Sequence, residues 1–104
     1  MDLFSILGKL QQEKPGVVES IAVMRKAVSE ASALDAKTAN LISVGIGTAL
    51  RNPEVIQGHI KLARDAGASR DEVISAILQA LPSAGVPAVL AAMPLAWEAY
   101  EGNE

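Results

Sequence analysis

The sequence contains no cysteine, and this absence excludes several chemistries at once. Disulfide bonds, thiolate nucleophiles and thiolate metal ligands cannot form. With a single histidine, a metal site would have to be completed by carboxylates alone, so we expect no metal. Gly45 and Gly47 lack the third glycine and the preceding strand of a nucleotide-binding fingerprint. We therefore expect no cofactor.

Clustered basic residues are also missing. The nine lysines and arginines are scattered along the chain, and the net charge is −3. Nucleic-acid binding requires a basic face, so no nucleic-acid partner is expected. The start of the chain, Met1 to Phe4, has an early acid and no basic region, so we expect no signal peptide and a cytoplasmic protein.

One uncharged stretch, residues 73–97, is 25 residues long and could span a membrane by length alone. It contains three prolines and a glycine, and much of its apolar character comes from alanine. Proline inside a helix removes a backbone hydrogen bond, which disfavours one continuous span. We interpret the stretch as two buried helices joined by a loop and expect no membrane partner.

The residues that are abundant are aliphatic. Half of the 104 residues are hydrophobic, whereas 20% are charged and 3% are aromatic. The length predicts a single domain over residues 1–104. A domain of this size has much surface for its volume, so some apolar surface should be buried against other subunits. The alternative is an alanine-rich helical monomer.

Apolar residues recur at helical spacing through most of the chain, and no sustained alternation typical of a strand is present. Capping signals mark the helix ends: Asp35, Asn52 followed by Pro53, Gly67, and Ser69 with Glu72 three residues later. These signals predict an all-α fold of about six helices, over residues 2–12, 17–31, 36–50, 53–66, 70–81 and 87–100. The third is apolar nearly all round, and its Gly45 and Gly47 indicate close approach of a neighbouring backbone.

The junction between the third and fourth helices, residues 50–59, holds the only histidine. His59 lies about two turns into the fourth helix. A lone histidine beside apolar positions is more often structural than catalytic. Glu54 and Arg51 are each explained by the helix dipole, which favours an acid in a first turn and a cation in a last turn.

Several segments in order resemble the carboxymuconolactone decarboxylase and AhpD-like family over roughly residues 17–101. These segments are Leu34-Asp35-Ala36-Lys37-Thr38 with Leu41-Ile42, then His59, then Ala66 to Val73, then Gly85-Val86-Pro87-Ala88. The resemblance implies a helical fold that assembles into a homotrimer or homohexamer through apolar helices. This agrees with the expectation drawn from composition.

The peroxidase branch of this family uses a Cys-x-x-Cys pair, a histidine and a glutamate. In this sequence the two cysteine positions fall on Asn52 and Val55, and the glutamate position falls on Asn40. Only the histidine matches, at His59. Since neither Asn52 nor Val55 can attack a hydroperoxide or resolve an oxidised thiol, peroxidase chemistry of this kind is excluded.

The decarboxylase branch also lacks the cysteine pair and keeps the histidine. The resemblance therefore implies a lyase acting on a small carboxylic or lactone acid. His59 would be the catalytic proton donor, and Arg51 with Glu54 would bind substrate; Arg64 or Lys61 of a neighbouring subunit is an alternative anchor. The competing hypothesis is a non-catalytic oligomeric binding or scaffold protein that keeps the fold without the chemistry.

Overall fold

A computed structural model describes residues 2–101, and these residues form helices without any strand. The helices are α1 (Leu3–Glu13), α2 (Pro15–Ala31), α3 (Ala36–Leu50), α4 (Pro53–Asp65), α5 (Arg70–Leu78), α6 (Leu81–Ala84) and α7 (Val86–Ala99). The predicted all-α fold is confirmed, with α6 a single additional turn. Within residues 2–101, no helix is both long enough and apolar enough to cross a membrane.

Two prolines open helices. α1 ends at Glu13, before Pro15, and Pro15 itself opens α2, so the second helix begins two residues earlier than predicted, with only Lys14 between α1 and α2. Proline suits a first helical turn because its missing N–H would have no partner there. For the same reason Pro82 lies in the first turn of α6 instead of in a loop, and α5 ends at Leu78.

The predicted caps are present at the starts of α3, α4 and α5. Each side chain accepts a backbone N–H of the first turn, which satisfies a donor that the helix cannot. The pairs are Asp35 with Thr38 at 2.7 Å, Asn52 with Val55 at 3.2 Å and Ser69 with Glu72 at 3.0 Å. Glu72 in turn accepts the Ser69 N–H at 2.9 Å, which completes the predicted capping box.

The hydrophobic core lies between α3, α4, α5 and α7. Its largest fully buried side chains are Val44, Thr48, Ile60, Val73 and Ile77. The Thr48 hydroxyl donates to the Val44 carbonyl at 2.8 Å, so this polar group is satisfied inside its own helix. The apolar spacing over residues 73–81 predicts that Leu78 and Leu81 face inward together with Val73 and Ile77, but Leu78 and Leu81 are exposed.

Close approach at the glycines of α3 is confirmed. A Cβ atom at Gly47 would lie 3.0 Å from Val55 Cγ1 and 3.1 Å from Ile56 Cγ1, and one at Gly45 would lie 3.3 Å from the Ala76 carbonyl oxygen. Any side chain would therefore push α4 or α5 away from α3. The two glycines let α3 lie tightly beside both neighbours.

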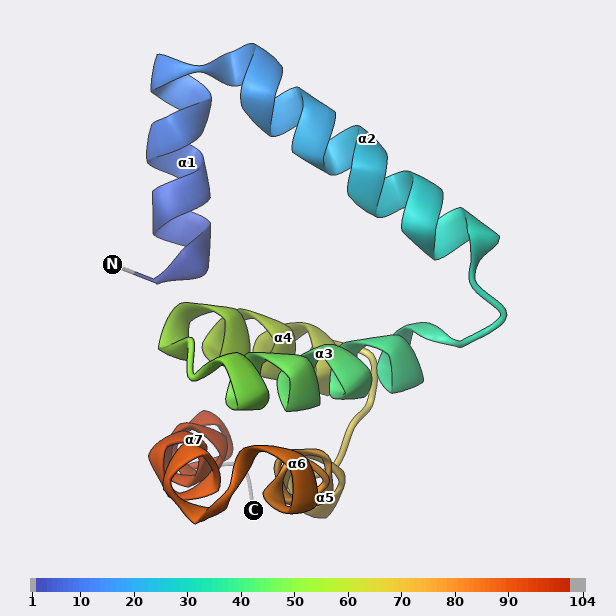
Figure 1. The fold of residues 1–104 in the computed structure, drawn as a ribbon. Coiled ribbons are helices and arrows are strands. Elements are labelled where there is room, and N and C mark those ends of the chain that lie inside the picture. The colour runs from blue at the N-terminus through green and yellow to red at the C-terminus, as the bar shows by residue number, and fades with distance from the viewer. Residues whose placement is uncertain (1, 102–104) are drawn as a thin grey trace.

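Helices α1 and α2 form a pair that stands apart from the other five, as Figure 1 shows. No residue of either helix is buried. α1 contacts α4 where Leu3 lies over Gly58; a Cβ atom there would be 2.5 Å from Leu3 Cδ2. α2 packs mainly against α1, so the apolar residues along it remain uncovered in a single chain.

Candidate functional site

The candidate site is built where α4 lies beside α3. Arg51 takes a left-handed backbone conformation with φ of 55°, and Asn52 then caps α4, so two residues suffice to reverse the chain. This tight reversal sets α4 along α3, and the partly buried His59 side chain meets Asn40 from α3. The two residues are 19 positions apart in the sequence.

His59 Nδ1 lies 3.2 Å from Asn40 Oδ1. The other end of the same amide is also engaged, because Asn40 Nδ2 donates to the Ala36 carbonyl at 2.8 Å. Turning the amide over would place its oxygen against that carbonyl oxygen, with no proton between them. The amide is therefore held with its oxygen toward the imidazole.

This orientation decides which ring nitrogen carries the proton. Asn40 Oδ1 can only accept, so His59 Nδ1 must donate. In the neutral imidazole the other nitrogen, Nε2, then has a free lone pair and can accept a proton. Asn40 thus acts on His59 as a carbonyl or carboxylate often does on a functional histidine, by selecting one tautomer and one ring orientation.

The surroundings favour the neutral form of this imidazole. Burial lowers the pKa of His59 below its usual 6.5, because the charged ring loses solvation, and the positive charge of Arg25 on α2 lowers the pKa further. His59 is thus mainly neutral at pH 7. A ligand with a carboxylate near Arg25 would oppose both effects and favour the imidazolium.

The two residues predicted to assist His59 are not brought to it. Arg51 is exposed at the end of α3, and neither Arg51 nor Glu54 forms a side-chain hydrogen bond or ion pair within residues 2–101. Glu54 and His59 are five residues apart on α4, which places them about 140° apart around the helix. The structure instead brings Asn40 into contact with His59, and the charge of Arg25 acts on the pKa of His59.

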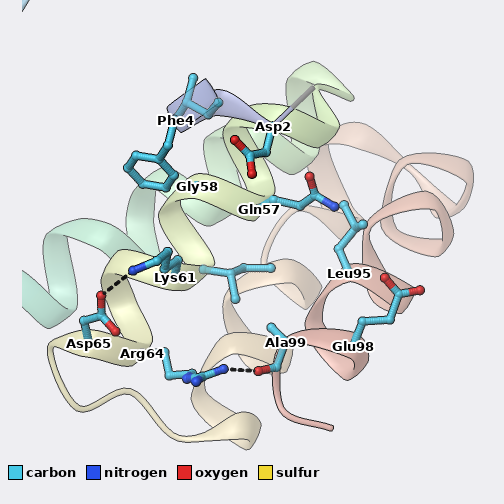
Figure 2. Close-up of a pocket in the computed structure, with 12 residues that line it drawn as sticks. Asp2, Phe4, Gln57, Gly58, Lys61, Arg64, Asp65, Leu95, Glu98 and Ala99 are labelled. Carbon is cyan, nitrogen blue, oxygen red and sulfur yellow. Dashed lines mark hydrogen bonds and ion pairs between the residues drawn. The ribbon is translucent and has the colours of Figure 1, made fainter. Parts of the chain in front are cut away.

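Lys61 and Arg64 lie on a different face of α4, in a cleft of 440 Å³ between the start of α1, α4 and α7 (Figure 2). Lys61 pairs with Asp65 at 3.1 Å and lies 5.8 Å from the centre of the Phe4 ring. Arg64 donates to the Ala99 carbonyl. Both cations are thus engaged within their own subunit, and His59 does not line this cleft.

A second cleft, of 640 Å³, lies between α3, α5 and α6 and is mostly apolar. His59 does not line this cleft either. Within residues 2–101 no group of three histidine, cysteine, aspartate or glutamate side chains is placed to hold a metal ion.

The fold and this histidine position define a class of protein. The carboxymuconolactone decarboxylase family model matches residues 15–98, and the chain belongs to this family. It is also similar to "uncharacterized protein 4 in cox locus" of Paracoccus denitrificans, with 31% identity over 71 residues. That match covers 68% of this chain and 64% of the relative, so the chain spans less than two thirds of that protein's length.

Asn40 was predictable from the sequence as a residue of this site, whereas Arg25 was not. The family resemblance places the glutamate position on Asn40, and Asn40 is the residue that binds His59. Arg25 was not singled out, because it lies 34 residues before His59 and nothing in its local pattern distinguishes it from its neighbour Lys26. Only the placement of α2 in the tertiary structure brings this charge into range of His59.

Proposed function

We propose that this protein is a homo-oligomeric lyase that decarboxylates a small carboxylic or lactone acid, with His59 as the residue that transfers the proton. The observation that supports this most directly is the Asn40–His59 hydrogen bond. It leaves a single oriented nitrogen, Nε2, for a ligand. Arg25, whose charge reaches the imidazole, is the proposed carboxylate anchor in place of Arg51 and Glu54.

The proposed chemistry balances without thiol or metal. A carboxylate that the product keeps lies near Arg25 and favours the imidazolium, whose Nε2–H points to the reacting carbon. The carbon–carbon bond to a second carboxylate breaks, CO₂ leaves, and the electron pair stays on the remaining lactone, delocalised into its carbonyl group. Nε2 then gives its proton to that carbon and returns to the neutral imidazole.

Release of CO₂ from carboxymuconolactone and from simpler lactone acids tests the proposal. His59→Gln should lower kcat by about 100-fold or more, the range typical of a positioned acid or base. Arg25→Gln should mainly raise KM, by about tenfold, since it removes a charged anchor. Lys26→Gln is the matched control, because Lys26 is the adjacent exposed cation on α2.

The pH profile tests the direction of proton transfer. Since the imidazolium is the donor, kcat/KM should fall as the pH rises above the His59 pKa of the free enzyme, which lies below 6.5. A profile that rises through this range would show that His59 acts as a base, and the decarboxylation mechanism would be wrong. Unchanged turnover in His59→Gln would remove His59 from the mechanism altogether.

The second candidate is a non-catalytic oligomeric binding or scaffold protein. It is favoured by the fact that neither cleft described above is lined by His59. Under this hypothesis no lactone acid is turned over, and His59→Gln alters stability alone. Calorimetric titration of wild type and Arg25→Gln with a small carboxylate separates two cases. A binding protein should take up the carboxylate and lose affinity in Arg25→Gln, whereas a purely structural protein should bind in neither form.

A further inference from the structure

The cleft between the start of α1, α4 and α7 has the dimensions of a small-molecule site. Its volume of 440 Å³ lies in the range of about 300–1,000 Å³ that such sites occupy. Leu3 and Phe4 of α1 and Leu95 of α7 give it apolar walls, and Ile60 of α4, which is 1% exposed, adds a firmly packed apolar surface. The remaining lining is mostly polar (Figure 2).

Three of the charged groups in this cleft are satisfied by contacts within the chain. Asp2 caps α1, because its carboxylate accepts the Ser5 N–H at 2.8 Å. Lys61 pairs with Asp65 at 3.1 Å, so these two charges offset each other. None of the three needs a ligand to balance it.

Glu98 is different, because its carboxylate forms no hydrogen bond or ion pair with any residue in the range 2–101. It lies in the last turn of α7, which has no basic residue of its own. A carboxylate is disfavoured at this position, because the carbonyl groups at the end of a helix carry partial negative charge. A residue that breaks a local rule at the wall of a cleft indicates a role in binding.

Arg64 supplies the opposite charge next to Glu98. Its guanidinium donates to the carbonyl of Ala99, the residue that follows Glu98, and Figure 2 shows the two charged side chains on either side of Ala99. They do not form an ion pair, so their charged atoms are more than 4.0 Å apart. Arginine has several N–H donors, and one bond to a neutral carbonyl leaves the others for a ligand.

We propose that this cleft binds a zwitterionic amino acid with an apolar side chain. The ammonium group of the ligand lies against Glu98, its carboxylate lies against Arg64, and its side chain lies against the apolar walls. A ligand with a single charge would satisfy one of these two groups and leave the other without a partner. An α-amino acid carries both charges next to a single carbon atom, so it can engage two neighbouring groups of opposite charge.

Matched small molecules test each recognised feature by calorimetric titration. L-Leucine carries all three features, whereas 3-methylbutylamine lacks the carboxylate, 4-methylpentanoate lacks the ammonium group and glycine lacks the apolar side chain. Leucine should bind about tenfold more tightly than each of the other three, because every deletion leaves part of the cleft without its partner. Tighter binding of the amine or of the acid than of leucine would overturn the proposal. Failure of leucine, valine and phenylalanine alike to bind at millimolar concentration would also overturn it.

Two substitutions assign the charged groups of the ligand to their partners. Glu98→Gln should weaken leucine binding by about tenfold and leave 4-methylpentanoate binding unchanged, since only the ammonium contact is lost. Arg64→Lys should weaken both of these ligands and spare 3-methylbutylamine, because lysine lacks the planar fork that binds a carboxylate. Glu19→Gln is the matched control, since Glu19 is an exposed acid of α2 that does not line the cleft. An equal loss in Glu19→Gln would overturn the site.

Urea unfolding distinguishes a binding role of Glu98 from a structural one. Without ligand, Glu98→Gln should unfold at the same or a higher urea concentration than wild type, because an unfavourably placed charge is removed. A lower midpoint would show that Glu98 supports the fold and would count against the site. Leucine should raise the midpoint of wild type more than that of Glu98→Gln. These results are independent of the proposed lyase, because His59 does not line this cleft.

Discussion

Asn40→Asp should raise the pKa of His59, and this substitution tests the site without any substrate. In the wild type the imidazole faces a neutral amide oxygen 3.2 Å from Nδ1, and burial keeps its pKa below 6.5. A carboxylate at the same position would face the same nitrogen with a full negative charge. It would therefore favour the imidazolium, which is the opposite of the present surroundings.

The size of the change follows from the distance. Two unit charges separated by this 3.2 Å attract by about 1 kcal/mol in bulk water and about 5 kcal/mol at an effective permittivity of 20. One pKa unit corresponds to about 1.4 kcal/mol. The expected rise is thus about 1–4 units, and it increases the charged fraction of His59 at pH 7.

Proton NMR can follow this titration directly, since His59 is the only histidine and its ring protons are unambiguous. Asn52→Asp is the matched control. It adds the same charge seven residues from His59, on a side chain that already caps α4, and an aspartate caps equally well. At that distance, about 10 Å along the helix, salt screens most of the effect.

Two results would refute the reasoning. One is a wild-type His59 that titrates at or above 6.5. The other is a shift in Asn40→Asp no larger than that in Asn52→Asp. The second carboxylate oxygen of the variant would face the Ala36 carbonyl, so the variant should also be less stable than wild type. Circular dichroism must therefore show that it is folded over the titrated range.

Three further predictions concern stability, measured by urea unfolding. Because folding lowers the pKa of His59, the unfolded chain binds more protons, so the free energy of unfolding should fall as the pH drops below about 6.5. His59→Gln should lose the contribution of His59 to this pH dependence. An equal pH dependence in wild type and variant would contradict the lowered pKa of His59. Gly47→Ala should destabilise the protein by about 1–2 kcal/mol, because crowding of the new methyl group against α4 exceeds the gain in helix propensity. Gly8→Ala should instead stabilise it by about 0.5–1 kcal/mol, because the space around Gly8 is open and only the gain in helix propensity remains. Tyr100→Phe should cost about 1–2 kcal/mol, since the buried hydroxyl donates to the Ala68 carbonyl at 2.6 Å; no loss would show that water replaces this bond.

Local signals in the sequence were sufficient for the helices and for the tight packing of α3. A cap such as Asp35 or Ser69 accepts a backbone N–H of the first turn of its own helix, so the helix start can be predicted without knowing the rest of the fold. Gly45 and Gly47 inside an apolar helix likewise have few explanations other than a close neighbour. The missing cysteine excludes thiol chemistry whatever fold the chain adopts.

Apolar periodicity, in contrast, shows that a helix face avoids water but not what covers it. Leu78 and Leu81 continue the apolar pattern of Val73 and Ile77, yet only the latter two reach the core, because α5 ends at Leu78 and the chain turns into α6. Val17, Met24 and Val28 of α2 recur at the same helical spacing as core-facing residues, yet all three are exposed in the single chain.

The helical class, the capped helix boundaries and the exclusion of thiol chemistry follow from the order of the amino acids, because each depends on contacts within a few residues or on composition. The groups around His59 depend on how the helices pack. Asn40 contacts His59 from α3, and the charge of Arg25 on α2 lowers the pKa of His59. Glu54 is much nearer to His59 in the sequence, but it lies on another side of α4. Residues close together on one helix can project from different sides of it, whereas residues far apart in the sequence meet where two helices pack together.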